Sequence, residues 1–139
     1  MCSDGWNYFN SSCYKAFDIN DYLNWHDAAD LCKSEKSFMV SLHSVEEENF
    51  IADMVDRTEY QHFVTWLGRK RNSSNSRFEW GDATDFEYAH FEYLKDEVYM
   101  CISMHRVHIF RSYFWAWMTD NCFEKLPRKI VCKKCSTKQ

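Results

Sequence analysis

Glycine, proline and long apolar runs are all scarce in this chain. Three glycines and one proline among 139 residues exclude a collagen-like or low-complexity segment. No run of about 18 apolar residues is present, and residues 1–4 lack the apolar core of a signal peptide, so we expect no membrane insertion of this segment. A large excess of positive charge is missing as well. The formal net charge of −4 argues against a general nucleic-acid binder.

Aromatic and apolar residues are abundant instead. Six Trp, eight Tyr and eleven Phe, with 45% hydrophobic residues overall, are enough for a sizeable core. The length suits one globular domain covering residues 1–139, with 133–139 as a basic tail. A second domain has no room.

Seven cysteines are many for a cytosolic chain of this length. The single C-x-x-C pair, Cys132 and Cys135, lacks the second pair that a zinc ribbon needs, so we expect disulfides rather than zinc. Oxidised cysteines place the chain outside the cell, either secreted or on the extracellular face of the cell surface. Two N-x-S/T motifs, at Asn10 and Asn72, are candidate glycosylation sites.

Motifs of catalysis are missing too. The six histidines are scattered, and neither G-x-S-x-G, nor H-E-x-x-H, nor a glycine-rich phosphate loop occurs. His105 and His108 could in principle bind zinc, but histidines three apart in a strand or loop need not share a face, so a solvated loop is the favoured interpretation. Trp115 and Trp117 fall on one face of a strand, where core packing is favoured over a stacking platform. We therefore expect no enzyme and no cofactor.

Periodicity and capping residues predict an α+β fold, with helices early and an antiparallel sheet late. Asn24 is a candidate N-cap for a helix whose apolar face holds Trp25, Ala28 and Cys32. Ser44 and Glu47 form a capping box for a second helix. A hairpin is expected over residues 6–18, and strands over 38–42, 63–68, 78–80, 99–104, 110–118 and 129–132.

The stretch Gly81–Tyr99 has no sustained period and many carboxylates. A structureless connection of this length in a small domain is usually functional, so we expect the main binding element here. The alternative is that its aromatic residues fold back on Trp80 and Trp117 as ordinary core. The expected binding residues, together with two from a nearby basic cluster, are Phe86, Tyr88, Phe91, Tyr93, Asp96, Glu97, Arg69 and Lys70.

Five motifs of cysteine, tryptophan and small residues follow one another along the chain: Cys2-x3-Trp6, Trp25-x2-Ala28-x3-Cys32, Val40-Ser41-Leu42 with Glu46-Glu47, Trp66-Leu67-Gly68, and Phe78-Glu79-Trp80-Gly81-Asp82. This arrangement resembles the C-type lectin-like domain family over essentially the whole chain, from Cys2 to Cys132. The resemblance implies two helices packed on antiparallel sheets and joined by disulfides.

The same resemblance implies a disulfide pattern. The family pairs correspond to Cys2 with Cys13, Cys32 with Cys132, and Cys101 with Cys122. Cys135 is then the odd cysteine, with an interchain bridge and a free or capped thiol as the two alternatives.

Calcium ligands of the sugar-binding family members are replaced in this chain. Their W-N-D triplet falls on Trp117, Met118 and Thr119, so Asp120 is one place late, and Asp96 and Glu97 are the other remaining carboxylates. A second family calcium site corresponds to Ser41, His43, Glu47 and Lys133, where the charge of Lys133 could stand in for the cation. Calcium-dependent sugar binding is therefore not expected.

The short spacing from Trp80 to Cys101 resembles the snake-venom C-type lectin-like proteins, which bind platelet receptors or clotting factors as heterodimers. The register Glu79-Trp80-x-Asp82-x5-Tyr88-x2-Phe91 supports this resemblance, whereas the extra loop cysteine of those chains is absent. Alternatives are the ectodomain of a lymphoid or myeloid lectin-like receptor, suggested by Trp115-Ala116-Trp117, and a secreted glycan-binding lectin. The expected function is a calcium-independent binding module for a protein ligand, within a disulfide-linked or loop-mediated dimer.

Overall fold

Two sheets and two helices make up the computed structural model, which describes residues 1–18, 23–55, 64–71, 78–85, 87–88, 91–93, 100–109, 112–125 and 129–136. The helices are α1 (Trp25–Ser34) and α2 (Val45–Val55). One sheet has the order β1-β2-β9-β3 and the other β5-β4-β7-β8-β6. The strands are β1 (Asn7–Phe9), β2 (Ser12–Asp18), β3 (Phe38–Met39), β4 (Val64–Lys70), β5 (Glu79–Trp80), β6 (Phe91–Tyr93), β7 (Cys101–Ile109), β8 (Ser112–Asp120) and β9 (Lys129–Cys135).

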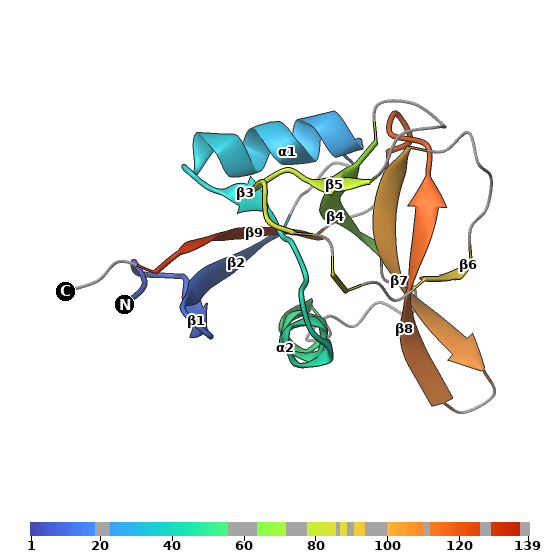
Figure 1. Cartoon of the computed structure of the whole chain (residues 1–139), viewed down its shortest axis with the longest axis horizontal. Coiled ribbons are helices and arrows are strands. Elements are labelled where there is room, and N and C mark those ends of the chain that lie inside the picture. The colour runs from blue at the N-terminus through green and yellow to red at the C-terminus, as the bar shows by residue number, and fades with distance from the viewer. Residues whose placement is uncertain are drawn as a thin grey trace.

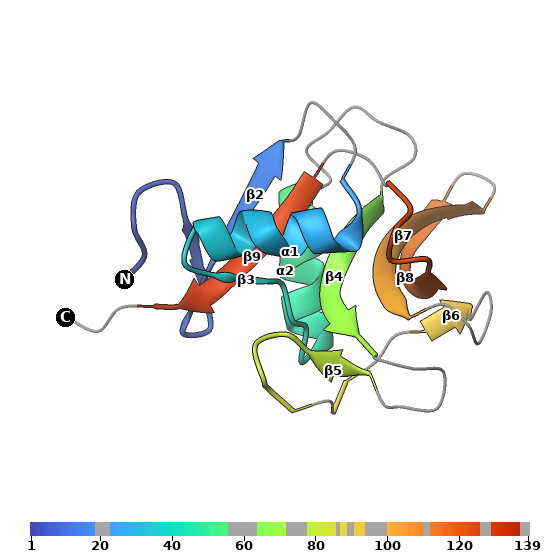
Figure 2. The same cartoon turned by 90° about the horizontal axis from the view of Figure 1, so that it is seen from above.

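The two helices lie on opposite sides of the first sheet (Figure 1). Seen from above, α1 crosses β9, and β4 runs from beside α1 toward β5 (Figure 2). Residue 1 and the C-terminal end of β9 lie on the same side of the molecule, at the end of the first sheet that is away from the second sheet (Figure 1). This arrangement confirms the expected fold class.

Local capping chemistry explains where the helices begin. The Asp27 N–H donates to Asn24 Oδ1 (2.8 Å), and the Glu47 N–H donates to Ser44 Oγ (3.1 Å), so both predicted N-caps are confirmed. The capping box is only half formed, because the Glu47 carboxylate accepts from the His43 N–H (2.7 Å) and not from the N–H of Ser44.

Strand lengths differ most from expectation near the end of the chain. The hairpin β7 and β8 pairs from Cys101 opposite Asp120 to Ile109 opposite Ser112, whereas its first strand was expected to end at residue 104. Strand β9 continues to Cys135, which pairs with Ser12, so residues 133–135 belong to the sheet and not to a basic tail. The short strand β6, which no period predicted, pairs parallel with β8, whereas the other described pairings of this sheet are antiparallel.

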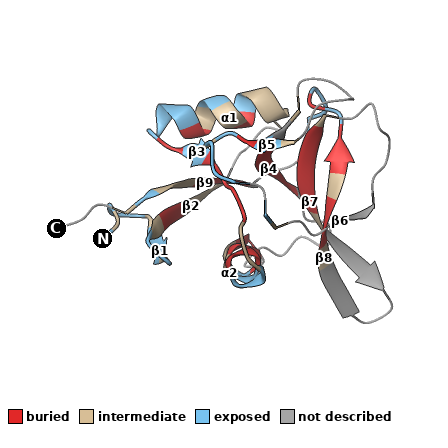
Figure 3. Ribbon diagram, in the orientation of Figure 1, coloured by how far each residue is buried: buried red, intermediate tan, exposed pale blue. Residues whose placement is uncertain are grey.

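Two apolar clusters fill the interior (Figure 3). The larger cluster joins α2 to the second sheet and includes Ile51, Leu67, Ile102 and Trp117, all fully buried. The smaller cluster lies under α1 and includes Ala28, Trp66 and the half-cystines of two disulfides. The two helices therefore cover different parts of the core.

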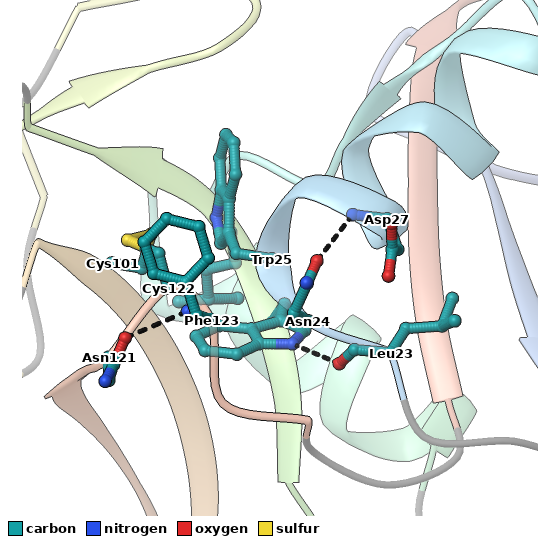
Figure 4. The surroundings of a disulfide bond; sticks show 10 residues. Leu23, Asn24, Trp25, Asp27, Cys101, Asn121, Cys122 and Phe123 are labelled. Atoms are coloured by element: carbon teal, nitrogen blue, oxygen red, sulfur yellow. Dashed lines mark hydrogen bonds between the residues drawn. A yellow bond between two sulfur atoms is a disulfide. The ribbon is translucent and has the colours of Figure 1, made fainter.

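Three disulfides join Cys2 to Cys13, Cys32 to Cys132, and Cys101 to Cys122, the pairs that the family resemblance implies. The second bridge spans a sequence separation of 100 residues and ties α1 to β9. The third lies beside the start of α1 (Figure 4), where the Trp25 N–H donates to Cys122 O (3.0 Å). Among the described residues, no helix is long and apolar enough to cross a membrane.

Candidate binding surface

The segment Gly81–Tyr99, which the sequence predicts to be the main binding element and which we call the recognition segment, leaves the second sheet at the end of β5 through a tight turn. The Gly81 N–H donates to Gly68 O (2.8 Å), and the Ala83 N–H donates to Trp80 O (3.1 Å). Ala83 has a φ of +63°, which an L-residue adopts at a cost and which the surrounding bonds hold in place. The start of the segment is thereby fixed against the sheet.

Asp82 anchors this turn to the loop before α2. Its Oδ2 accepts from Ser41 Oγ (2.5 Å), while Oδ1 accepts from the Thr84 N–H (3.1 Å) and hydroxyl (2.5 Å). Burial alone would raise the pKa of this carboxyl, but the hydrogen bonds from Ser41 and Thr84 and the nearby charge of Lys133 outweigh it and lower the pKa below its usual value. Asp82 is therefore ionised and holds this turn to Ser41 by hydrogen bonds.

His43 joins the recognition segment at two points. Its Nδ1 lies 2.6 Å from Glu87 Oε1, and its Nε2 lies 2.9 Å from Thr84 Oγ1. The imidazole also packs edge-on against Trp80, with 5.9 Å between ring centroids. These contacts border an open hollow of about 420 Å³, which His43, Ala83, Thr84, Asp85 and Glu87 line.

Lys133 reaches from β9 into the site that the family resemblance assigns to calcium. Its Nζ donates to Ser41 O (3.1 Å), Ser41 Oγ (3.1 Å) and Glu47 Oε2 (2.6 Å). Its ammonium also lies 5.6 Å from the centroid of the Tyr14 ring. A cation thus lies between the oxygens of Ser41 and Glu47, and it is supplied by the protein itself, as the sequence suggested.

Tyr14 completes this cluster from β2. Its hydroxyl donates to Glu47 Oε2, which also accepts from Lys133. Burial and then the hydrogen bond to Glu47 raise the pKa of Tyr14 well above its ordinary value, so the phenol stays protonated and remains a donor. We call Tyr14, Ser41, Glu47, Asp82 and Lys133 the polar cluster; it links β2, α2, β9 and the recognition segment.

Tyr88 was expected among the binding residues, but it is partly buried. Its ring packs edge-on against Trp117 with 5.6 Å between centroids, and its hydroxyl donates to Glu48 Oε2 (2.9 Å). Trp117 in turn packs against Trp80 at 5.8 Å. Tyr88 therefore follows the alternative, in which an aromatic residue of the segment folds back on the core.

Arg69 was expected among the binding residues, but its side chain is buried. Its side chain is 2% exposed and lies over the rings of Phe78 (5.3 Å) and Trp80 (5.2 Å), with Nη2 donating to Phe78 O (2.7 Å). Burial lowers the pKa of the guanidinium to about 9, which still leaves it charged at neutral pH. Arg69 therefore packs against Trp80 of β5.

The other expected binding residues are only partly covered by the described structure. The backbones of Phe91 and Tyr93 form β6, opposite Trp117 and Met118 of β8, and the backbone of Lys70 lies in β4. Their side chains lie outside the described part of the chain. The remaining predictions on undescribed residues concern Phe86, Asp96, Glu97 and the glycosylation candidate Asn72.

Asp120, the carboxylate that falls one place late for a calcium ligand, is 1% exposed. Its Oδ2 accepts from Ser103 Oγ and lies 3.2 Å from His105 Nε2. Ser103 Oγ contacts the same imidazole nitrogen at 2.6 Å, so these three residues do not form a relay, which needs the serine and the carboxylate on opposite ring nitrogens. In the described portion of the chain, no three His, Cys, Asp or Glu side chains gather to hold a metal ion.

Two modification candidates lie at accessible positions. Asn10 and Ser11 form the exposed turn between β1 and β2, with φ of 45° and 71°, so the Asn10 motif is open to a glycosyltransferase. Cys135 is an exposed free thiol at the end of β9. Its position beside Ser12 of β2 holds it at the edge of the sheet.

Phe123 is a surface feature that the sequence did not reveal. It is 72% exposed, and its N–H donates to Asn121 Oδ1 (2.9 Å) next to the Cys101–Cys122 bridge (Figure 4). Its ring lies 5.5 Å from that of His26. The only local signal is the Asn two residues earlier, which is typical of an Asx turn.

Comparisons with known proteins give a consistent result. The family model described as "Lectin C-type domain" matches residues 21–134. "Snaclec coagulation factor X-activating enzyme light chain 1" of Daboia siamensis is 36% identical over 134 residues, which cover 95% of this chain and 82% of that protein. A chain of the "Snaclec coagulation factor IX/factor X-binding protein" of Trimeresurus stejnegeri is 26% identical, covering 95% and 84%. Among solved structures, EMS16, titled an antagonist of the collagen receptor integrin α2β1, superposes with a TM-score of 0.62 at 26% identity, covering 97% of this chain and all of that one.

Proposed function

Because this chain belongs to the C-type lectin domain family, we propose that it is an extracellular, non-catalytic module that binds a protein surface without calcium. Its three disulfides require an oxidising compartment, which supports an extracellular location. Polar and aromatic residues surround the candidate surface. The cluster of Ser103, His105 and Asp120 lacks relay geometry, because Ser103 and Asp120 contact the same imidazole nitrogen. Beside His43, the Ser41 hydroxyl donates to Asp82 at 2.5 Å and lies farther, 3.3 Å, from His43 Nε2. The fold supplies a rigid scaffold for a loop that binds.

The position of Lys133 is the observation that carries calcium independence. Its ammonium already compensates the buried charge of Glu47 and contacts both oxygens of Ser41. A divalent cation at the same place would have to displace a covalently attached cation at 2.6 Å from the carboxylate. The charge of Glu47 is therefore compensated without a metal ion.

The names of the relatives indicate the class of partner. One is called a factor IX/factor X-binding protein, one a light chain of a factor X-activating enzyme, and one an antagonist of integrin α2β1. We propose that the ligand of this chain is a protein of the same class, either a plasma clotting factor or a platelet receptor. A partner chain of the same fold, joined through the recognition segment or through Cys135, is part of this proposal.

The recognition segment is the proposed contact surface. The turn that starts it is held by Asp82, and Glu87 is held by His43, so its acidic residues are presented from a defined backbone. Acidic rims accelerate association with basic partners by steering. Phe91 and Tyr93 are proposed as the apolar anchors, since buried aromatic residues dominate the affinity of protein interfaces.

Binding measurements on the intact chain test this proposal. Purified clotting factors and platelet receptor ectodomains are passed over the immobilised chain, and a glycan array is measured in parallel. Binding to a protein of this panel that free monosaccharides at millimolar concentration leave unchanged is the expected result. Binding to glycans alone, abolished by a calcium chelator, would contradict it.

Variants locate the surface. Phe91→Ala and Tyr93→Ala are expected to weaken protein binding at least tenfold while the thermal midpoint stays within 2 °C of wild type. Phe123→Ala is the matched control, because it removes an exposed aromatic side chain outside the segment. If Phe91→Ala lowers the midpoint strongly and leaves binding intact, these aromatic residues are core and the proposed surface is wrong.

A further inference from the structure

A pocket of about 540 Å³ lies between α1, the turn into β3, Gly68 of β4 and Gly81 just after β5. Its size falls in the range of sites that hold drug-sized ligands. It is distinct from the polar cluster and shares only Gly81 with the recognition segment. The lining residues are Trp25, Ala29, Asp30, Lys33, Lys36, Ser37, Phe38, Met39, Gly68 and Gly81.

Two glycines keep part of the pocket wall free of side chains. A Cβ on Gly68 would lie 2.3 Å from Met39 O, so close backbone approach excludes any side chain there. Gly81 donates its N–H to Gly68 O (2.8 Å), which brings the turn after β5 against β4. The pocket is therefore a consequence of how β3, β4 and β5 meet.

The side walls are mainly apolar and aromatic. Phe38 is 53% exposed although it lies in a strand, which leaves its ring accessible to a ligand. The Trp25 indole N–H donates to Leu67 O (2.9 Å), so this residue offers its ring and not its donor. Met39 adds a polarisable wall that adapts to flat rings. The Ser37 hydroxyl donates to Cys32 O (2.7 Å) and is engaged as well.

Charge on the lining residues is asymmetric. Lys33 at the end of α1 and Lys36 just after it contribute two cations, against one carboxylate from Asp30. Both lysines are exposed, and within the described part of the chain neither has an ion-pair partner. An apolar chamber with an excess of positive charge favours an amphipathic anion.

We propose that this pocket binds a small aromatic molecule carrying one acidic group. The aromatic body would pack between Trp25 and Phe38, and the carboxylate, sulfate or sulfonate would face Lys33 and Lys36. Aromatic walls favour a ring system over an alkyl chain. Two ammonium groups without a fixed partner favour an anion over a neutral ring.

Two fluorescent probes that differ by one sulfonate test the proposal on the intact, oxidised chain. 8-Anilinonaphthalene-1-sulfonate is expected to bind at one site per chain, at least tenfold more tightly than N-phenyl-1-naphthylamine, which has the same rings without the charge. Laurate supplies an anion without rings and is expected to displace the sulfonate at least tenfold less effectively than a naphthalene sulfonate. Equal affinity of the two probes, or equal displacement by laurate, would overturn the assigned ligand class.

Paired variants place the probe. The double variant Lys33→Gln with Lys36→Gln is expected to weaken binding of the sulfonate probe at least fivefold and to leave binding of the neutral probe unchanged. Lys125→Glu makes the same change in net charge outside the pocket and should change the affinity of neither probe. Ala29→Leu fills the pocket and is expected to weaken both probes tenfold, while Ser34→Leu on the same helix does not. Thermal midpoints verify that each variant is folded, and shifts of the amide signals of Gly68 and Gly81 on titration give an independent location. Unchanged binding in Ala29→Leu without those shifts means adsorption elsewhere and refutes the site.

Discussion

Replacing Lys133 by methionine should destabilise the chain strongly, because it removes the internal cation of the polar cluster. The Lys133 and Glu47 side chains are 12% and 7% exposed, so the carboxylate left behind would be almost completely buried without its 2.6 Å partner. Breaking a buried pair in this way costs about 3 to 5 kcal/mol. Glu47 keeps hydrogen bonds from Tyr14 and the His43 N–H, which favours the lower end, about 3 kcal/mol.

Guanidinium unfolding of the oxidised protein measures this loss directly, and calorimetry should show a fall in the thermal midpoint of about 10 °C for a domain of this size. Lys134→Met is the matched control. That neighbouring lysine lies over the Trp6 ring at 4.1 Å, an interaction worth about 1 kcal/mol or less. A double variant, Lys133→Met with Glu47→Gln, should lose less than the sum of the two single changes. A cost below about 1 kcal/mol for Lys133→Met, or equal costs for the two lysines, would refute the role assigned to the ammonium.

The polar cluster and the disulfides support further expectations. Lys133→Glu should be unstable without calcium and should recover several degrees of thermal midpoint in millimolar calcium. The midpoint of the wild type should shift by less than 1 °C, and a larger shift would contradict calcium independence. The pKa of Asp82 is lowered in the folded state, so its contribution to stability is present above the ordinary carboxyl pKa of 3.8 and is lost as the pH falls below that value. Asp82→Asn should therefore reduce the loss of unfolding free energy at acidic pH. Cys135→Ser should leave the midpoint unchanged, whereas loss of Cys32 should cost about 4.7 kcal/mol by the loop-entropy relation. Native mass before and after reduction reports whether Cys135 joins two chains. Tyr88→Phe should cost about 1 kcal/mol and leave protein binding intact, which a loss of binding at unchanged stability would disprove.

Features governed by near neighbours in sequence were predictable. The N-caps at Asn24 and Ser44 and the apolar face with Ala28 and Cys32 depend on spacings of a few residues, and all three are present. The family resemblance added the disulfide pattern and the likeness to a calcium site, including the proximity of Lys133 to Ser41. These features depend on the identity of single residues and on spacings along the chain that resemble those of the family.

Features governed by contacts between residues far apart in the chain were not predictable from the sequence. A basic cluster next to a turn gave no indication that Arg69 lies under Phe78 and Trp80, because burial is decided by β5 pairing with β4. The hydrogen bond between His43 and Glu87 joins residues 44 apart. Glu47 bonds Lys133 and Tyr14 across the chain and not the N–H of Ser44 at its own helix cap. Strand β9 extends past Cys132 because β2 offers backbone partners as far as Ser12. The sequence alone determined which elements form and which charges are available, whereas the packing of two sheets and two helices decided which of those charges are buried, paired or exposed to a ligand.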